Sequence, residues 1–121
     1  MLRGPQYVFS SEELFDKIRH PLAKENKPLT IALGFQSDNL LSGCVTIHQE
    51  SFLPIPPCKV FRPLLRVGSD AVVVLRYEPV GEVFPLEQDY ENKFGLHEAG
   101  QILEIPLLDY LLIGKTNWFS L

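Results

Sequence analysis

The chain has 121 residues, a net charge of −4 and 45% hydrophobic residues. This length suits a single domain over residues 1–121 that buries its own core, and the average composition excludes a disordered or fibrous protein. The acidic balance, without any block of Lys or Arg, argues against a nucleic-acid-binding surface.

The first third of the chain predicts a helix followed by a hairpin. Ser10 and Glu13 have the spacing of a capping box, so a helix should begin there, and Pro28 requires it to end before residue 28. The apolar strands 29–35 and 40–47 flank the polar turn 36–39, which predicts an antiparallel pair. The apolar face of the helix would hold Leu14, Phe15, Ile18 and Leu22.

The remainder alternates helices and strands. Prolines predict an irregular loop over 51–57, and a short helix over 59–67 should follow it. The β-branched run 71–75 predicts a central strand covered on both faces. A loop over 77–86 then leads into a helix over about 87–104, and strands at 107–113 and 118–121 complete the chain. The helix over 59–67 would place Val60, Phe61, Leu64 and Leu65 inward.

This order of elements predicts an α/β fold with a central mixed sheet flanked by helices. No apolar run approaches the ~20 residues of a membrane helix, and the first residues show no signal-like pattern. We therefore expect a cytoplasmic protein that makes no membrane contact. Two cysteines, Cys44 and Cys58, are too few for a disulfide framework or a Cys-based zinc cage, so we expect buried or unreactive thiols.

The loop after the central strand is the first place to search for chemistry, because ligands of α/β sheets tend to sit beyond the carboxyl ends of strands. Residues 76–81 read Arg-Tyr-Glu-Pro-Val-Gly. Four acids lie in this loop or just after it. They could form an oxygen-rich site for Mg²⁺ or Ca²⁺, but the simpler interpretation is that they are surface acids of a polar loop. These acids are Glu78, Glu82, Glu87 and Asp89.

Several segments of the second half together resemble the RadC-like JAB (JAMM/MPN) family. They are Val60-Phe61-Arg62-Pro63, the strand after it, the loop with Pro79 and Gly81, Asp89, and residues 105–114, which read Ile-Pro-Leu-Leu-Asp-Tyr-Leu-Leu-Ile-Gly. That family shows an arginine-bearing helix, a strand ending in His-x-His-Pro-Ser-Gly, a Ser-x-x-Asp and a late Leu-Leu-Asp-His-Ile-Ile-Gly-like strand. The resemblance runs without a gap from 60 to 114, and the part before it fits with a length adjustment at 51–58. It implies a bacterial-type JAB/MPN-like (cytidine-deaminase-like) domain.

The resemblance also implies a site. Family members bind zinc through two histidines and an aspartate, use an upstream glutamate as base, and stabilise the oxyanion with a serine; such a site leaves an open position for water. Carried over by position, the first histidine falls on Arg76, the second on Glu78 and the serine on Leu86, and the aspartate is retained as Asp89. The upstream glutamate falls near residues 27 and 28, which are Lys and Pro.

Arg76 decides what this site can do. A guanidinium cannot be deprotonated into a ligand and repels a nearby cation, so we expect no zinc and no other cofactor. If the strand extends through Glu78, then Arg76 and Glu78 share one face of the sheet. We expect Arg76 to fill the vacated metal position and to pair with Asp89 or Glu78. Asp89 could instead cap the start of the following helix.

Three functions remain open. The first is a catalytically inactive domain, without catalytic residues, that binds a protein partner through the former active-site groove and the adjacent sheet edge. The second is a metal-dependent hydrolase of peptide or isopeptide bonds that uses Glu78 and Asp89 in a non-standard site. The third is a structural or self-associating domain that exposes the proline-rich loop around Ile55 and the last strand.

Other reactive or aromatic residues receive simpler interpretations. His20, His48 and His97 lack the spacing of a shared metal site, and a partly buried, hydrogen-bonded side chain is expected for His97. No Ser/His/Asp or Cys/His arrangement stands out. The aromatic residues Tyr90, Phe94 and Trp118 are expected to be core or interface anchors.

Overall fold

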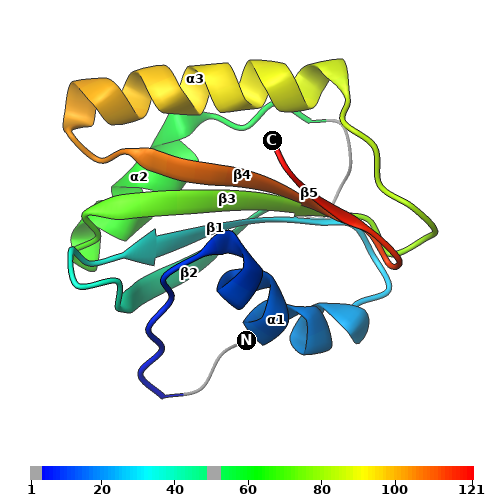
Figure 1. The fold of residues 1–121 in the computed structure, drawn as a ribbon. Coiled ribbons are helices and arrows are strands. Elements are labelled where there is room, and N and C mark those ends of the chain that lie inside the picture. Colours follow the sequence, from blue (N-terminus) through cyan, green and yellow to red (C-terminus); the bar gives the residue numbers. More distant parts are fainter. Residues whose placement is uncertain (1–3, 49–52) are drawn as a thin grey trace.

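A computed structural model describes residues 4–48 and 53–121, and within them the chain forms three helices and five strands. In chain order these are α1 (Ser11–Ala23), β1 (Leu29–Phe35), β2 (Leu41–His48), α2 (Pro57–Arg66), β3 (Ala71–Tyr77), α3 (Glu87–Leu103), β4 (Leu107–Ile113) and β5 (Trp118–Ser120). The strands form one sheet in the order β2-β1-β3-β4-β5, in which only β3 and β4 are parallel. The predicted α/β fold with a mixed sheet flanked by helices is confirmed (Figure 1).

The sheet separates two apolar layers. On one face α1 packs through its buried residues Leu14, Ile18 and Leu22 against β1, β3 and β4. On the other face α2 and α3 cover the sheet, with Phe61 and Leu96 among the buried contacts. Figure 1 shows α1 and α3 on opposite sides of the strands. The central position of β3 explains why its β-branched run is buried on both faces, as predicted.

The start of α1 follows from the predicted cap. The Ser10 hydroxyl accepts a hydrogen bond from the Glu13 backbone N–H at 3.1 Å, which satisfies one of the free donors at the helix start. The Glu13 carboxylate accepts in return from the N–H of Phe9, at 3.0 Å. The two halves of a capping box are therefore present, although the second involves Phe9 instead of Ser10.

Several boundaries differ from prediction by one or two residues. Strand β2 runs from Leu41 to His48, α2 starts at Pro57, and β3 extends to Tyr77. Pro57 suits the first position of a helix, because the N–H that proline lacks would be unpaired there. Strand β3 is longer because β4 pairs with it up to its last residue. Of the predicted loop 51–57, residues 51 and 52 lie outside the described part of the chain.

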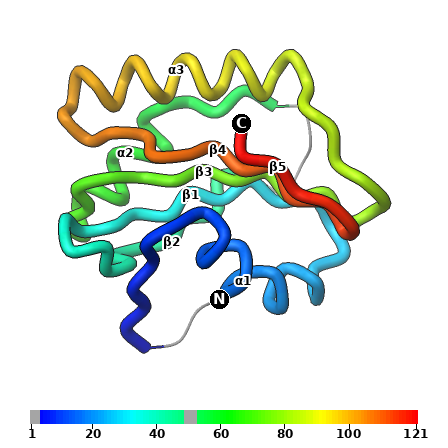
Figure 2. The backbone as a smooth tube through the Cα atoms, in the orientation of Figure 1, coloured from blue at the N-terminus to red at the C-terminus, as the bar shows by residue number. Residues whose placement is uncertain are grey.

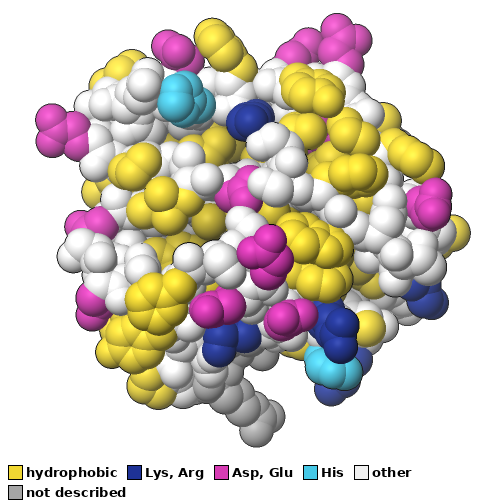
Figure 3. Space-filling model, viewed as in Figure 1, with side chains coloured by type: hydrophobic (Ala, Val, Ile, Leu, Met, Phe, Trp, Pro, Cys, Tyr) yellow, Lys and Arg dark blue, Asp and Glu magenta, His cyan; other side chains and the backbone are white. Residues whose placement is uncertain are grey.

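Some predicted exposures were wrong. Leu65 of α2, expected to face inward, is 48% exposed. In α3, Tyr90 and Phe94 were expected to be core or interface anchors, and their exposure excludes the core position. The buried face of α3 holds Asp89, Asn92, Leu96 and Gly100 instead, which are also at helical spacing. Figure 3 shows hydrophobic side chains reaching the surface between charged ones on one face of the molecule.

The remaining exposures also depart from expectation. His97 is exposed, whereas a partly buried side chain was expected. Cys44 and Cys58 are also exposed, which excludes the buried alternative for these thiols. Ile55, expected at a surface for self-association, is only 6% exposed and packs in the layer under α2 and α3. Trp118 is an anchor as predicted, because its ring stacks on that of Phe15 with centroids 4.9 Å apart. Among the described residues, no helix is both long and apolar enough to cross a lipid bilayer.

Candidate functional site

Two loops meet at the carboxyl end of β3. The loop 78–86 and the turn between β4 and β5 lie at the same end of the sheet (Figure 2). The Asn117 side chain joins them, because its oxygen accepts from the Val83 N–H at 2.8 Å and its amide donates to the Val83 carbonyl at 2.9 Å. The N–H of Lys115 also donates to the carbonyl of Gly81 at 3.0 Å. These bonds hold the loop before α3 in place.

Arg76 points from β3 into the layer between the sheet and α3. Side chains alternate along a strand, so Arg76 lies on the same face as Val72 and Val74, which contact the α2 and α3 layer. Its side chain is 5% exposed. Nε donates to Asp89 Oδ1 and Nη2 to Asp89 Oδ2, both at 2.8 Å, which makes a bidentate ion pair.

Four of the five guanidinium N–H groups donate hydrogen bonds. Nη2 of Arg76 donates to the carbonyl of Phe84 at 3.0 Å, and Nη1 to Glu78 Oε1 at 3.3 Å. The expected pairing of Arg76 with Asp89 or Glu78 is confirmed, and both acids take part. Glu78 lies at the rim, with 23% of its side chain exposed, whereas the pair with Asp89 is buried.

Asp89 serves as a cap and an ion-pair partner at once. It lies at the third position of α3, is 1% exposed, and accepts the Leu86 N–H on Oδ2 at 2.9 Å. On Oδ1 it accepts the Tyr110 hydroxyl at 3.0 Å. Each oxygen therefore accepts two hydrogen bonds, one of them from Arg76, which uses the lone pairs of an ionised carboxylate.

The other acids of the loop behave as surface groups. Glu82 and Glu87 are exposed, as expected for acids of a polar loop, whereas that interpretation was wrong for the buried Asp89. Leu86 is half-buried at the N-cap position of α3 and has no side-chain oxygen to accept the N–H of Asp89. The start of α3 is thus capped by Asp89 alone.

The electrostatics of the cluster favour the charged guanidinium. Burial by itself lowers the pKa of Arg76, but the hydrogen bonds to Asp89 and the charges of Asp89 and Glu78 outweigh it and raise the pKa further above its ordinary value. Burial, reinforced by the charge of Asp89, raises the pKa of the Tyr110 phenol. Tyr110 therefore remains a neutral donor to Asp89 across the physiological range.

The raised pKa of Tyr110 predicts a loss of stability in alkali. The phenol ionises near pH 10 in the unfolded chain but keeps its proton to higher pH in the folded chain. The free energy of unfolding is therefore unaffected by this group below about pH 10 and decreases as the pH rises above it. The slope contributed by this one group reaches at most about 1.4 kcal/mol per pH unit. Urea unfolding between pH 8 and 11 measures it. Tyr110→Phe should flatten the slope, with Tyr90→Phe at an exposed position as the matched control.

Comparisons with known proteins identify the family. A family model described as the RadC-like JAB domain matches residues 8–121. The chain belongs to this family. A UPF0758 protein of Trichlorobacter lovleyi is 32% identical over 113 residues, which are 92% of this chain and 49% of that protein. A UPF0758 protein of Staphylococcus haemolyticus is 39% identical over 93 residues, 75% of this chain and 41% of that protein.

A third UPF0758 protein, from Chlorobium luteolum, is 27% identical over 115 residues, which are 93% of this chain and 52% of that protein. The chain thus spans about half the length of the curated relatives that it matches.

The zinc site that the family resemblance implies does not fit the side chains of this RadC-like JAB domain. Within residues 4–48 and 53–121, no group of three His, Cys, Asp or Glu side chains is arranged to hold a metal ion. Arg76 has no lone pair to donate, and the oxygens of Asp89 are already engaged. Lys27 and Pro28, where the upstream glutamate would fall, bring no carboxylate.

Two partners of the cluster were not foreseen from the sequence. Tyr110 lies in the buried strand β4, where the alternation of side chains places it on the same face of the sheet as Arg76. Nothing in the sequence of that strand shows that the Tyr110 hydroxyl reaches Asp89. The Phe84 carbonyl is a backbone group in an irregular loop, and backbone acceptors leave no trace in a side-chain pattern. A buried Tyr normally seeks a hydrogen-bond partner, which is the one signal that was available.

Proposed function

We propose that this RadC-like JAB domain is catalytically inactive and acts by binding a protein partner. In this proposal Arg76 and Glu78 stand at the positions of two metal ligands, Leu86 stands at the position of the serine, and Asp89 is the retained third ligand. The observation that supports it most strongly is the buried bidentate pair between Arg76 and Asp89.

The chemistry of that pair supports the loss of hydrolytic activity. A hydrolytic zinc site needs three deprotonated ligands and an open position for water. Here the permanently charged guanidinium of Arg76 donates two hydrogen bonds of 2.8 Å to Asp89, the one carboxylate proposed as a retained ligand. A divalent cation would have to displace the guanidinium into an apolar layer, at the cost of a buried unpaired charge. Leu86, in turn, offers no hydroxyl to stabilise an oxyanion.

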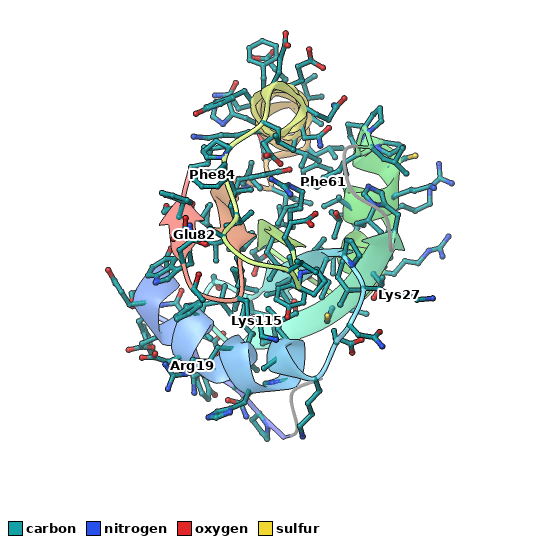
Figure 4. All side chains as sticks on the ribbon, turned by 90° about the vertical axis from the view of Figure 1, so that its right-hand side faces the viewer. Arg19, Lys27, Phe61, Glu82, Phe84 and Lys115 are labelled. Carbon is teal, nitrogen blue, oxygen red and sulfur yellow. The ribbon has the colours of Figure 1, made fainter. Side chains whose placement is uncertain are left out.

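The surface around the pair supports a protein partner. The loop 78–86 carries exposed Val80 and Phe84 beside the acid Glu82, and Figure 4 shows Phe84 and Glu82 along this loop. Exposed aromatic and apolar side chains are enriched in protein interfaces. The acids at 78, 82 and 87 would repel phosphates, which disfavours a nucleic acid at this place.

Elemental analysis tests the loss of metal binding. Protein without an affinity tag, expressed in zinc-supplemented medium and purified without chelator, should contain far less than one zinc per chain. Stoichiometric zinc that disappears in Glu78→Ala would overturn the proposal in favour of the metal-dependent hydrolase. The measurement needs a parallel blank of buffer carried through the same columns.

A crosslinking experiment tests the binding surface. A photo-reactive amino acid at position 84 should crosslink to a defined protein in cells, while the same group at the exposed Ile102 of α3 should not. Equal crosslinking at the two positions argues against a specific surface in the loop. A crosslinked product of twice the chain mass would instead indicate self-association, which mass measurement in solution checks directly.

A further inference from the structure

A concave site lies on the opposite face of the sheet from Arg76. It is a cavity of about 470 Å³ between α1, the last residues of β3 and β4, and the turn that joins β4 to β5. Tyr77 and Ile113, which line it, belong to the apolar layer under α1. The volume falls in the range of small-molecule sites, about 300–1,000 Å³. The cavity is therefore separate from the ion pair discussed above.

The lining of this cavity combines cations and aromatic rings. Arg19 and His20 come from α1 and Lys115 from the turn, whereas no Asp or Glu among the described residues lines it. Figure 4 looks onto this end of the molecule and shows Lys115 close to Arg19, with Lys27 to one side. The chain has a net charge of −4, so the positive charge of the cavity lining is opposite in sign to that of the chain as a whole.

The cations of the cavity are not used inside the described part of the chain. No carboxylate there lies within ion-pair distance of Arg19 or Lys115, in contrast to Arg76, whose partners are both acids. The acids nearest along the sequence are Asp16 and Glu25 for Arg19 and Asp109 for Lys115, and none of them lines the cavity. The exposed Glu25 is near enough for its charge to help raise the pKa of Tyr77, after the larger effect of burial. An anion entering it would meet two charged donors without having to displace an internal partner.

The aromatic side of the cavity gives a flat contact surface. Phe15 and Trp118 are stacked with an interplanar angle of 11°, and both line the cavity together with Tyr77. Aromatic faces favour a planar apolar group in offset or edge contact. The cations and the rings come from different elements, so one ligand can contact both.

We propose that this cavity binds a small molecule that carries a flat apolar ring and one anionic group, a carboxylate or a phosphate. The anion contacts Arg19 and Lys115, with His20 as a further donor, and the ring packs beside Trp118. Because the cavity lies across the sheet from Arg76, the proposal is independent of the inactive-site proposal.

The single tryptophan of the chain provides the measurement. Its indole N–H gives one peak in a ¹H–¹⁵N spectrum of the full chain, and titration follows that peak with 2-naphthoate, 2-naphthyl phosphate, 2-naphthamide and inorganic phosphate. We expect saturable shifts with one or both of the ring-bearing anions, and the stronger of the two identifies the anionic group. Binding should weaken by roughly tenfold or more with the uncharged amide or with ringless phosphate.

Variants locate the binding groups. Arg19→Gln combined with Lys115→Gln should weaken binding by roughly tenfold or more, while Lys24→Gln combined with Lys27→Gln removes the same charge at exposed positions outside the cavity and should change little. The spectra themselves report whether each variant is folded. The proposal is overturned if no probe moves the peak at millimolar concentration. Equal binding of the amide, equal binding of inorganic phosphate, or equal loss in the two double variants also overturns it.

Discussion

Replacing Asp89 by alanine should lower the free energy of unfolding by about 3–5 kcal/mol, because the buried Arg76 guanidinium loses its bidentate partner and, of its two acids, keeps only the longer contact with Glu78 at the rim. The same substitution removes the acceptor for the Leu86 N–H and for the Tyr110 hydroxyl. For a domain whose total stability is on the order of 5–15 kcal/mol, this is a large fraction. Urea unfolding followed by circular dichroism measures it.

Two controls separate the ion pair from a general effect of losing an acid. Glu82→Ala removes an exposed acid from the preceding loop and should change stability by less than about 0.5 kcal/mol. In a double-mutant cycle, Arg76→Met and Asp89→Asn together should cost less than the sum of the two single changes, since neither charge is then left unpaired. Additive losses in this cycle would show that the two side chains are not coupled.

Installing histidines at positions 76 and 78 should create zinc binding. In Arg76→His with Glu78→His the cation is gone, Asp89 is released from its bidentate bond, and two imidazoles lie two residues apart at the end of β3, on one face. We expect about one zinc per chain, measured by elemental analysis and by calorimetric titration. Zinc at 100 times its dissociation constant should then raise the stability by about 2.7 kcal/mol.

Matched variants establish which side chains hold the metal. Arg76→Gln with Glu78→Gln removes the same charges without adding ligands and should stay free of zinc. Adding Asp89→Asn to the histidine pair should weaken the binding, because an amide is a poorer ligand than a carboxylate. A folded histidine variant that takes up no zinc would mean that residues 76, 78 and 89 do not hold the geometry of a former metal site.

The elements of this fold follow closely from local patterns in the sequence. The β-branched run at 71–75 predicted a covered central strand, which is β3, and the Ser10 and Glu13 spacing placed the start of α1 correctly. The buried face of α3 could not be predicted from the sequence: Tyr90 and Phe94, expected to be core or interface anchors, are exposed, whereas Asp89 and Asn92 are buried. A helix with a polar buried face has no clear periodicity, so only the groups that it packs against show which side is inside.

For the site, the sequence by itself excluded residue 76 as a metal ligand. An arginine at position 76 cannot ligate a metal in any fold. The shared strand face expected for Arg76 and Glu78 required a strand through residue 78, whereas β3 ends at Tyr77; the two side chains nevertheless meet at 3.3 Å. The tertiary structure decided which carboxylate pairs with Arg76. Asp89, Tyr110 and the Phe84 carbonyl come from three segments, and only the parallel pairing of β3 with β4 and the anchored loop before α3 bring them to one guanidinium.

The cavity beside Trp118 could not be predicted from the sequence at all. Arg19 and Lys115 are far apart in the chain and have no shared motif, so nothing in the pattern of residues links them. The sequence determined which groups are charged and which stretches form helix or strand, because those are properties of single residues and their near neighbours. It left open which distant side chains meet, because that depends on how the sheet orders its strands and on where α1 crosses its face.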